Sequence, residues 1–121
     1  MAFLFLSLYS LSAKAQSQLN LVVLPNLEGT EIALKKFIGE KPLVVNFWAA
    51  WCTACADEMP ELKKLQSDYK DQAYFIGVNA GDKPIRAQKF IKKHGFPYLI
   101  LMDKDKSIAK IAVTGAFIVF S

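Results

Sequence analysis

Cys52 and Cys55 are the residues of this chain whose type and spacing most clearly indicate chemistry, and they are its only cysteines. Two tryptophans precede them, at a point where a buried strand is expected to pass into a helix. Side chains three positions apart share one face of a helix, so the two sulfurs can reach disulfide distance. The free backbone N–H groups of a helix start stabilise a thiolate. The pattern predicts Cys52 as a nucleophile and Cys55 as the resolving thiol.

Other interpretations of this pair need residues that the sequence does not supply. A four-ligand zinc site would need a second cysteine pair or several histidines, and His94 is the only histidine. A purely structural disulfide would close a loop too small to stabilise the fold much. Copper handling would need more ligands than Met59 and His94 near the pair. Peroxidase chemistry is disfavoured because Arg86, the only arginine, is far from the motif in the sequence. We therefore expect no metal ion and no cofactor. Two ordinary buried cysteines are a further alternative, but they do not usually follow Trp-Ala-Ala-Trp at a helix start.

Composition indicates one folded domain. The chain has 121 residues, a hydrophobic content of 53% and a net charge of +4, so it can bury a core. Its lysines occur in scattered doublets, which are typical of a solvated surface, and no basic stripe interleaved with aromatics is present. We expect protein partners, a monomer and no nucleic-acid binding.

Residues 1–15 resemble a secretion signal. An apolar run of signal-peptide length ends in Ala13-Lys14-Ala15, a small-x-small cleavage pattern that would place the mature start near Gln16. No lysine or arginine precedes the run, and the alternative is a buried N-terminal strand or helix. The expected organisation is a signal peptide or membrane anchor at 1–15 and one domain at 16–121. This organisation predicts a periplasmic or otherwise extracytoplasmic location.

Strands alternate with helices along the rest of the chain. Before the cysteines we expect a strand at 19–24 broken by Pro25, a turn at 28–30, a strand at 32–34, a helical turn at 35–38 and a buried strand at 43–47. After it we expect a helix at 52–69, a strand at 74–79, a helix from Pro84 to Gly95, a strand at 98–102, a short helix at 107–112 and a strand at 116–120. The first helix should bury a stripe of Met59, Leu62, Leu65 and Tyr69 and bend at Pro60. The order predicts an α/β fold with parallel strands in its sheet.

The segment 46–62, which reads NFWAAWCTACADEMPEL, resembles the active-site segment of TlpA/ResA-like thiol-disulfide oxidoreductases in the thioredoxin superfamily. The likeness extends from about residue 19 to 115. It implies a thioredoxin-like fold, a central sheet flanked by helices, with an N-terminal β-hairpin. It also implies an extracytoplasmic protein that reduces disulfides of partner proteins, often in cytochrome c maturation, through a Cys52/Cys55 dithiol.

The resemblance gives possible roles to residues around the cysteines. Asn46 stands where thioredoxins proper carry a buried acid. Glu58, three residues after Cys55, occupies the position of an acid implicated in tuning the thiols, although it could equally be a solvated glutamate. Trp48 and Trp51 are expected to pack around the site and shape partner contact, and the alternative for both is core packing, which is favoured more for Trp48 than for Trp51.

Two features depart from the family pattern. Thr53-Ala54 lies between the cysteines where a proline often precedes the second one. The family also has a cis-proline loop facing the disulfide, followed by a strand pair and a helix, but no proline follows Pro97 here. These departures predict a C-terminally truncated member whose last strand and helix are missing. The alternative function is a degenerate, non-catalytic thioredoxin-like fragment or binding module.

Overall fold

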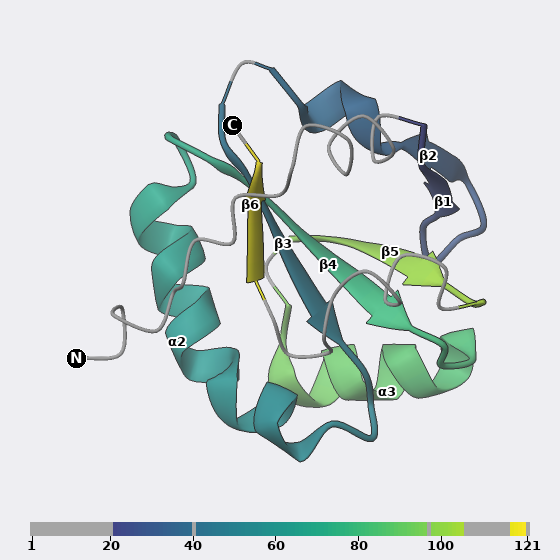
Figure 1. Ribbon diagram of the computed structural model, residues 1–121. Helices are drawn as coiled ribbons and strands as arrows, with labels where there is room; N and C mark the ends of the chain where they lie inside the picture. The colour runs from purple at the N-terminus through teal and green to yellow at the C-terminus, as the bar shows by residue number, and fades with distance from the viewer. Residues whose placement is uncertain (1–20, 40, 97, 106–116, 121) are drawn as a thin grey trace.

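The computed structural model describes residues 21–39, 41–96, 98–105 and 117–120. Within them, a four-stranded sheet has the order β5-β4-β3-β6 (Figure 1). Its strands are β3 (Leu43–Trp48), β4 (Tyr74–Ala80), β5 (Leu99–Asp103) and β6 (Phe117–Phe120). Helix α2 (Thr53–Tyr69) connects β3 to β4, and helix α3 (Pro84–His94) connects β4 to β5. The predicted α/β order is confirmed.

The sheet contains the predicted parallel strands and one antiparallel strand. β3, β4 and β5 are parallel, but β6 runs antiparallel to β3, with Asn46 opposite Phe117 and Leu43 opposite Phe120. A parallel strand needs a crossover that returns the chain to the opposite end of the sheet. β5 ends beside the end of β4, and β6 starts beside the end of β3. The chain therefore re-enters the sheet from the end at which it left, and an antiparallel strand results.

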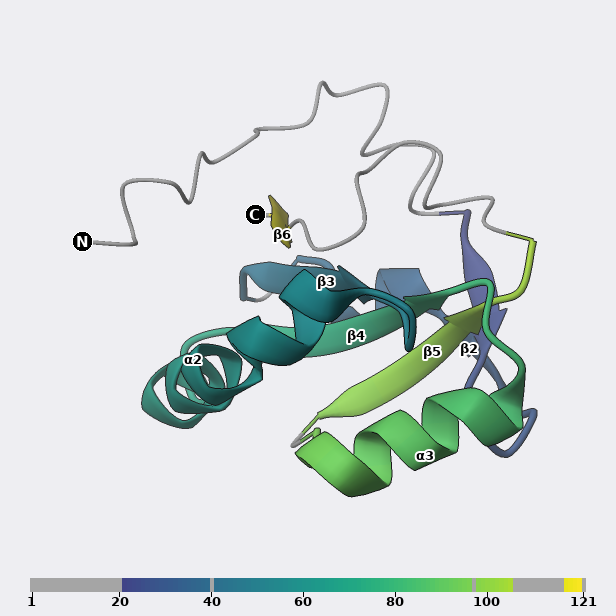
Figure 2. The ribbon, with the colours of Figure 1, turned by 90° about the horizontal axis from the view of Figure 1, so that it is seen from below.

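Different elements pack on the two faces of the sheet. α2 and α3 lie together on one face (Figure 2). Two parallel strand pairs built outward in the same direction, each with a right-handed crossover, place both helices on that side. The other face packs against a hairpin of β1 (Val23–Pro25) and β2 (Glu31–Ala33) and against the 3₁₀ helix η2 (Leu34–Phe37). The predicted N-terminal hairpin and helical turn are thus present.

The hairpin differs from its prediction at Pro25. The proline does not break the strand but is its last residue, paired with Glu31. A proline is tolerated there because a strand of a two-stranded ribbon has one edge that needs no donor. The side chain of Asn26 then forms the turn, as its Oδ1 accepts hydrogen bonds from the backbone N–H groups of Glu28 and Thr30. A bridge between Asn26 and Leu101 holds the hairpin against β5.

Helix α2 buries a narrower stripe than its sequence predicts. Met59 and Leu62 are buried, but Tyr69 is 50% exposed. Pro60 lies inside the helix, which continues to Tyr69. The bend expected at this proline stays a prediction.

Helix α3 begins and ends at the predicted residues. Pro84 occupies its first turn, where a missing N–H is harmless, and Gly95 closes it in the left-handed conformation at φ 71°. Ala87 and Phe90 face the sheet. Ile85, in the first turn, is 57% exposed.

Two predicted features lie outside the described residues. They are the signal-like segment at 1–15 and the short helix at 107–112. Among the described residues, none of the helices has the length and apolar character needed to cross a bilayer.

Candidate active site

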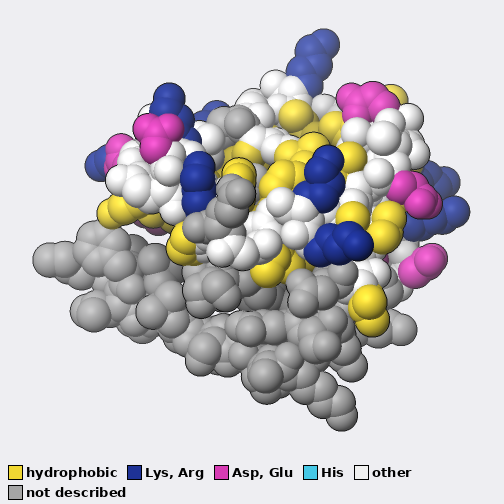
Figure 3. Space-filling model, turned by 90° about the horizontal axis from the view of Figure 1, so that it is seen from above, with side chains coloured by type: hydrophobic (Ala, Val, Ile, Leu, Met, Phe, Trp, Pro, Cys, Tyr) yellow, Lys and Arg dark blue, Asp and Glu magenta, His cyan; other side chains and the backbone are white. Residues whose placement is uncertain are grey.

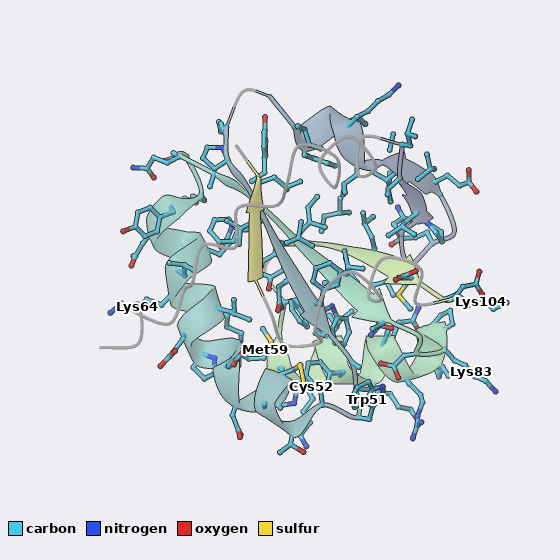
Figure 4. The ribbon with its side chains drawn as sticks, viewed as in Figure 1. Trp51, Cys52, Met59, Lys64, Lys83 and Lys104 are labelled. Carbon is cyan, nitrogen blue, oxygen red and sulfur yellow. A yellow bond between two sulfur atoms is a disulfide. The ribbon has the colours of Figure 1, made fainter. Side chains whose placement is uncertain are left out.

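The two cysteines form a disulfide at the junction between β3 and α2. Their Cα atoms are 5.3 Å apart, and Figure 4 shows Cys52 beside Trp51 at the end of the sheet. Helix α2 starts at Thr53, so Cys52 precedes the first turn as its N-cap residue and Cys55 lies within that turn. The pairing expected from the Cys-x-x-Cys spacing is therefore present in the structure.

Cys52 occupies the position where a helix usually has a serine or threonine. Its Sγ accepts a hydrogen bond from the backbone N–H of Cys55 at 3.2 Å, as an N-cap oxygen would. The side chain is half-buried. The positive end of the helix dipole also points at this sulfur. Both effects favour a thiolate at Cys52 once the disulfide is reduced.

Cys55 is in a different environment. It is 2% exposed and packs in an apolar cluster with Met59 and Trp48. Its Sγ lies 3.9 Å from the backbone carbonyl oxygen of Phe47. An apolar environment and a nearby carbonyl oxygen both disfavour a negative sulfur. The geometry thus separates an accessible sulfur, which favours the thiolate, from a buried one, which favours the neutral thiol.

A buried carboxylate that sequence reasoning missed holds the loop before Cys52. Asp82 Oδ2 accepts a hydrogen bond from the backbone N–H of Ala50 at 2.6 Å and another from Asn79 Nδ2 at 2.9 Å. Asn79 Oδ1 in turn accepts from the backbone N–H of Asp82 at 3.0 Å. Asn79 and Asp82 are 0% and 7% exposed. The signal in the sequence was the position of Asn79 near the end of a buried parallel strand and of Asp82 just after it, at the same edge of the sheet as the cysteines.

The two tryptophans have opposite environments. Trp48 is fully buried, with ring centroids 4.9 Å from Phe90 and 4.7 Å from Phe96. Gly77 makes room for it, since a Cβ at that position would lie 3.1 Å from Trp48 Nε1. Trp51 is 60% exposed next to Cys52. Trp48 therefore takes the core position that the sequence left open as an alternative, and Trp51 does not.

Asn46 lies beneath the site on β3 and is 3% exposed. Its Nδ2 donates to the hydroxyl oxygen of Tyr98 at 3.2 Å. Burial raises the pKa of Tyr98 to about 12, although the hydrogen bond from Asn46 lowers it. Where a thioredoxin proper would carry a buried ionisable acid, this chain has a neutral amide–phenol pair.

Glu58 lies one turn beyond Cys55 on α2, and its side chain is half-buried. Its Oε2 is buried and has no hydrogen-bond partner among the described residues. Burial raises the pKa of the Glu58 carboxyl, and the negative charge of Glu61 raises it further. Glu58 is therefore not a fully solvated helical glutamate but a partly desolvated acid near the cysteines.

An open hollow of about 400 Å³ lies beside Cys52, between the start of α2 and one side of α3. Cys52 and Thr53 line it from one side, and Arg86, Lys89 and Lys93 line it from the other. Arg86 is far from the cysteines in the sequence but close to Cys52 in the folded protein. The fold brings Arg86 into the same hollow as Cys52 because α3 packs beside α2 on one face of the sheet. Among the described residues, no group of three or more His, Cys, Asp or Glu side chains is placed to hold a metal ion.

A Cys-x-x-Cys at the start of a helix that follows a central parallel strand, in a sheet covered by two helices on that face, defines a thioredoxin-like protein. The sequence profile of the AhpC/TSA family matches residues 15–112. The chain belongs to this family.

Known proteins with similar sequences are thiol-disulfide oxidoreductases by name. The chain is 36% identical over 97 residues to thiol-disulfide oxidoreductase ResA of Halalkalibacterium halodurans, covering 79% of this chain and 54% of that protein. It is 35% identical to ResA of Bacillus thuringiensis subsp. konkukian, covering 73% of this chain and 51% of that protein. The chain thus spans about half the length of the curated relatives it matches.

Solved structures confirm the thioredoxin-like fold. A secreted Mycobacterium tuberculosis disulfide oxidoreductase homologous to E. coli DsbE superposes with a TM-score of 0.69 at 25% identity, over 77% of this chain and 68% of that one. The structure of MTB dsbF, in mixed oxidised and reduced forms, superposes with a TM-score of 0.71 at 25% identity, over 84% of each chain.

Proposed function

We propose that this protein is a thiol-disulfide oxidoreductase that reduces disulfides of extracytoplasmic partner proteins through Cys52 and Cys55. The observation that carries the proposal is the asymmetry of the pair. Cys52 caps a helix and lines an open hollow, whereas Cys55 is buried behind it. An exchange reaction needs one sulfur that can meet a partner and a second that is shielded from that partner.

The reaction follows from this arrangement. The Cys52 thiolate attacks one sulfur of a partner disulfide, the partner's S–S bond breaks, and its second sulfur leaves as a thiolate that takes up a proton. Cys55 then loses its proton and attacks Cys52 Sγ, which releases the first partner sulfur as a second thiol. Two electrons pass to the partner, and the Cys52–Cys55 disulfide remains. An external dithiol must reduce that disulfide before the next cycle.

Glu58 and Trp51 have supporting roles in this proposal. Cys55 needs a base when it becomes the attacking group, and Glu58 follows it by one turn on the same side of α2. A half-buried carboxyl with a raised pKa is a better proton acceptor than an ordinary glutamate. Trp51 presents an exposed ring beside the reactive sulfur, where a partner's backbone would lie.

Three observations support the proposed location and partners. The signal-like segment at 1–15 favours export, and one similar structure is that of a secreted protein. The resemblance to TlpA/ResA-like proteins favours a partner of the cytochrome c maturation type.

The test is a single-turnover reaction. Pre-reduced protein is mixed with insulin in equal amounts, and the appearance of insulin thiols is followed. Cys52→Ser should slow this reduction by at least about 1,000-fold, because the nucleophile is lost. Cys55→Ser should accumulate a mixed disulfide with insulin, visible on a non-reducing gel, because the second step is blocked.

The result that would contradict the proposal is a folded, pre-reduced protein that transfers no electrons to insulin or to any small disulfide. A cooperative thermal transition would establish that the sample is folded. That combination would favour the alternative, a non-catalytic binding module.

A further inference from the structure

The hollow beside Cys52 is strongly basic on its α3 side. Arg86, Lys89 and Lys93 are exposed and lie three and four residues apart, so they form one row along the helix. Phe90 and His94 lie in the same wall, with ring centroids 4.3 Å apart. Among the described residues that line the hollow there is no carboxylate. We call this row of three cations, with the two rings, the basic wall.

The basic wall differs from the charged surface on the face seen in Figure 3. On that face, lysine and arginine side chains lie among apolar side chains and beside several aspartate and glutamate side chains. At the basic wall, three cations face one hollow, and the positive end of the α2 dipole points into it as well. Their potentials add in a partly enclosed space, where water screens them less than on an open surface. The hollow therefore attracts negative charge.

The position of the wall ties this charge to the reaction. A partner disulfide must place one of its sulfurs on Cys52, so the residues flanking that sulfur lie over the hollow. From Arg86 to Lys93 the helix rises about 10 Å, which matches about three residues of an extended chain. Side chains within about three residues of the attacked cysteine can thus reach the wall.

We propose that the basic wall selects partner proteins whose reactive disulfide is flanked by acidic residues. The occupant is an extended, acidic segment of the partner, with its cysteine on Cys52 and its carboxylates on Arg86, Lys89 and Lys93. Charge complementarity carries this choice, because three cations without a carboxylate among them would repel a basic segment. The inference rests on the proposed exchange activity and names its substrate class.

The experiment compares three disulfide peptides of one length that differ only in their flanking residues, which are acidic, neutral or basic. The rate of reduction by the pre-reduced protein is followed by liquid chromatography at low ionic strength. We expect the acidic peptide to be reduced about tenfold faster than the basic one, as for electrostatically steered encounters. In about 1 M salt this ratio should approach one, because screening acts over about 3 Å.

Charge reversal tests the wall itself. In K89E/K93E, the ratio of the acidic to the basic rate should fall below one, and in K89Q/K93Q it should fall close to one. K35E/K36E, on η2, changes the net charge by the same amount but lies on the other face of the sheet, and it should keep the original preference. Circular dichroism and thermal unfolding confirm that each variant is folded.

The outcomes separate the two proposals. If the neutral peptide is not reduced at all, the exchange activity itself is contradicted. If the neutral peptide is reduced but the acidic and basic peptides react equally fast, only the acidic-partner inference is overturned. The inference is also overturned if K35E/K36E lowers the preference as much as K89E/K93E, because net charge rather than the wall would then be responsible.

Discussion

The two faces of the sheet are built for different tasks, although the same strands supply both. Successive residues of a strand point to opposite faces, so β3, β4 and β5 each contribute to two clusters. The buried cluster of the face under the hairpin is aliphatic apart from one phenylalanine, and its members are Leu24, Leu34, Leu43, Val45, Phe47, Ile76, Val78 and Leu101. The face under the helices carries aromatic and sulfur-containing side chains, and its cluster is Trp48, Cys55, Met59, Leu62, Ala87, Phe90, Ile100 and Met102.

The hairpin side of the sheet contributes to stability, and the helix side contributes to stability and to the chemistry of the site. The hairpin-side cluster excludes water and stabilises the fold by burial alone. The helix-side cluster also buries Asn46 and Asn79, whose polar groups must be hydrogen-bonded and therefore fix specific positions. Fixed side-chain positions are needed on the helix side because Cys52, Cys55 and the basic wall lie there. Substitutions on the first face should change stability only, and substitutions on the second should change stability and rate together.

Two neighbouring residues of β5 allow the two faces of the sheet to be compared directly. Leu101 is fully buried on the hairpin side, and Ile100 is 5% exposed on the helix side, close to Gly77 and Trp48. Leu101→Ala and Ile100→Ala should each lower the free energy of unfolding by about 2–5 kcal/mol, because both leave a cavity. Only Ile100→Ala should also slow disulfide exchange severalfold, because Trp48 and the loop after it lose support.

Urea unfolding and peptide reduction, both measured below the unfolding temperature of each variant, provide the two readouts. Equal loss of rate in Leu101→Ala and Ile100→Ala would contradict the division between the faces. Equal loss of stability with unequal loss of rate would support it.

The Asp82 network tests the polar part of the helix side. Asp82→Ala removes the acceptor for the Ala50 N–H and for Asn79 Nδ2, and it should lower the free energy of unfolding by about 1–3 kcal/mol. The loop that carries Cys52 should also become less ordered, so exchange should slow. Asp82→Asn keeps an oxygen acceptor and serves as the matched control, with part of both losses restored. An unchanged exchange rate in Asp82→Ala would show that the loop holds its position without this carboxylate.

The order of elements was predictable because each has a strong local signal. The buried strands of β3 and β4 are short apolar runs, and Pro84 and Gly95 mark the ends of α3 by their backbone chemistry. Cys52 and Cys55 were identifiable because they are close in sequence. The Asp82 network and the basic wall were not, because they depend on which elements pack side by side. Lys93 belonged to a doublet interpreted as solvated, and only the packing of α3 against α2 places it beside Cys52.

Substitution of Glu58 should have the smallest effect of these variants. It should raise the stability of the fold and slow the exchange reaction. Burial raises its pKa in the folded state, so the folded protein holds this proton more tightly than the unfolded chain does. At a pH below the ordinary glutamate pKa both states are protonated, and Glu58 has no effect on stability. As the pH rises, the unfolded chain ionises first and the folded state becomes less stable. Glu58→Gln should therefore unfold at a higher temperature than the parent at neutral pH and at the same temperature in acid.

The gain in stability should stay below about 1 kcal/mol, because the side chain is only half-buried and solvent screens it. If Glu58 accepts the Cys55 proton, Glu58→Gln should at the same time lengthen the lifetime of the mixed disulfide at neutral pH. Glu61→Gln is the matched control, since it keeps the Glu58 carboxylate and removes only the neighbouring charge, which raises the Glu58 pKa less than burial does, so it should lengthen that lifetime less than Glu58→Gln. Thermal unfolding at two pH values and quenched-flow trapping of the mixed disulfide measure the two effects. A Glu58→Gln protein that gains stability without a longer-lived mixed disulfide would limit Glu58 to a partly buried charge with no part in the exchange.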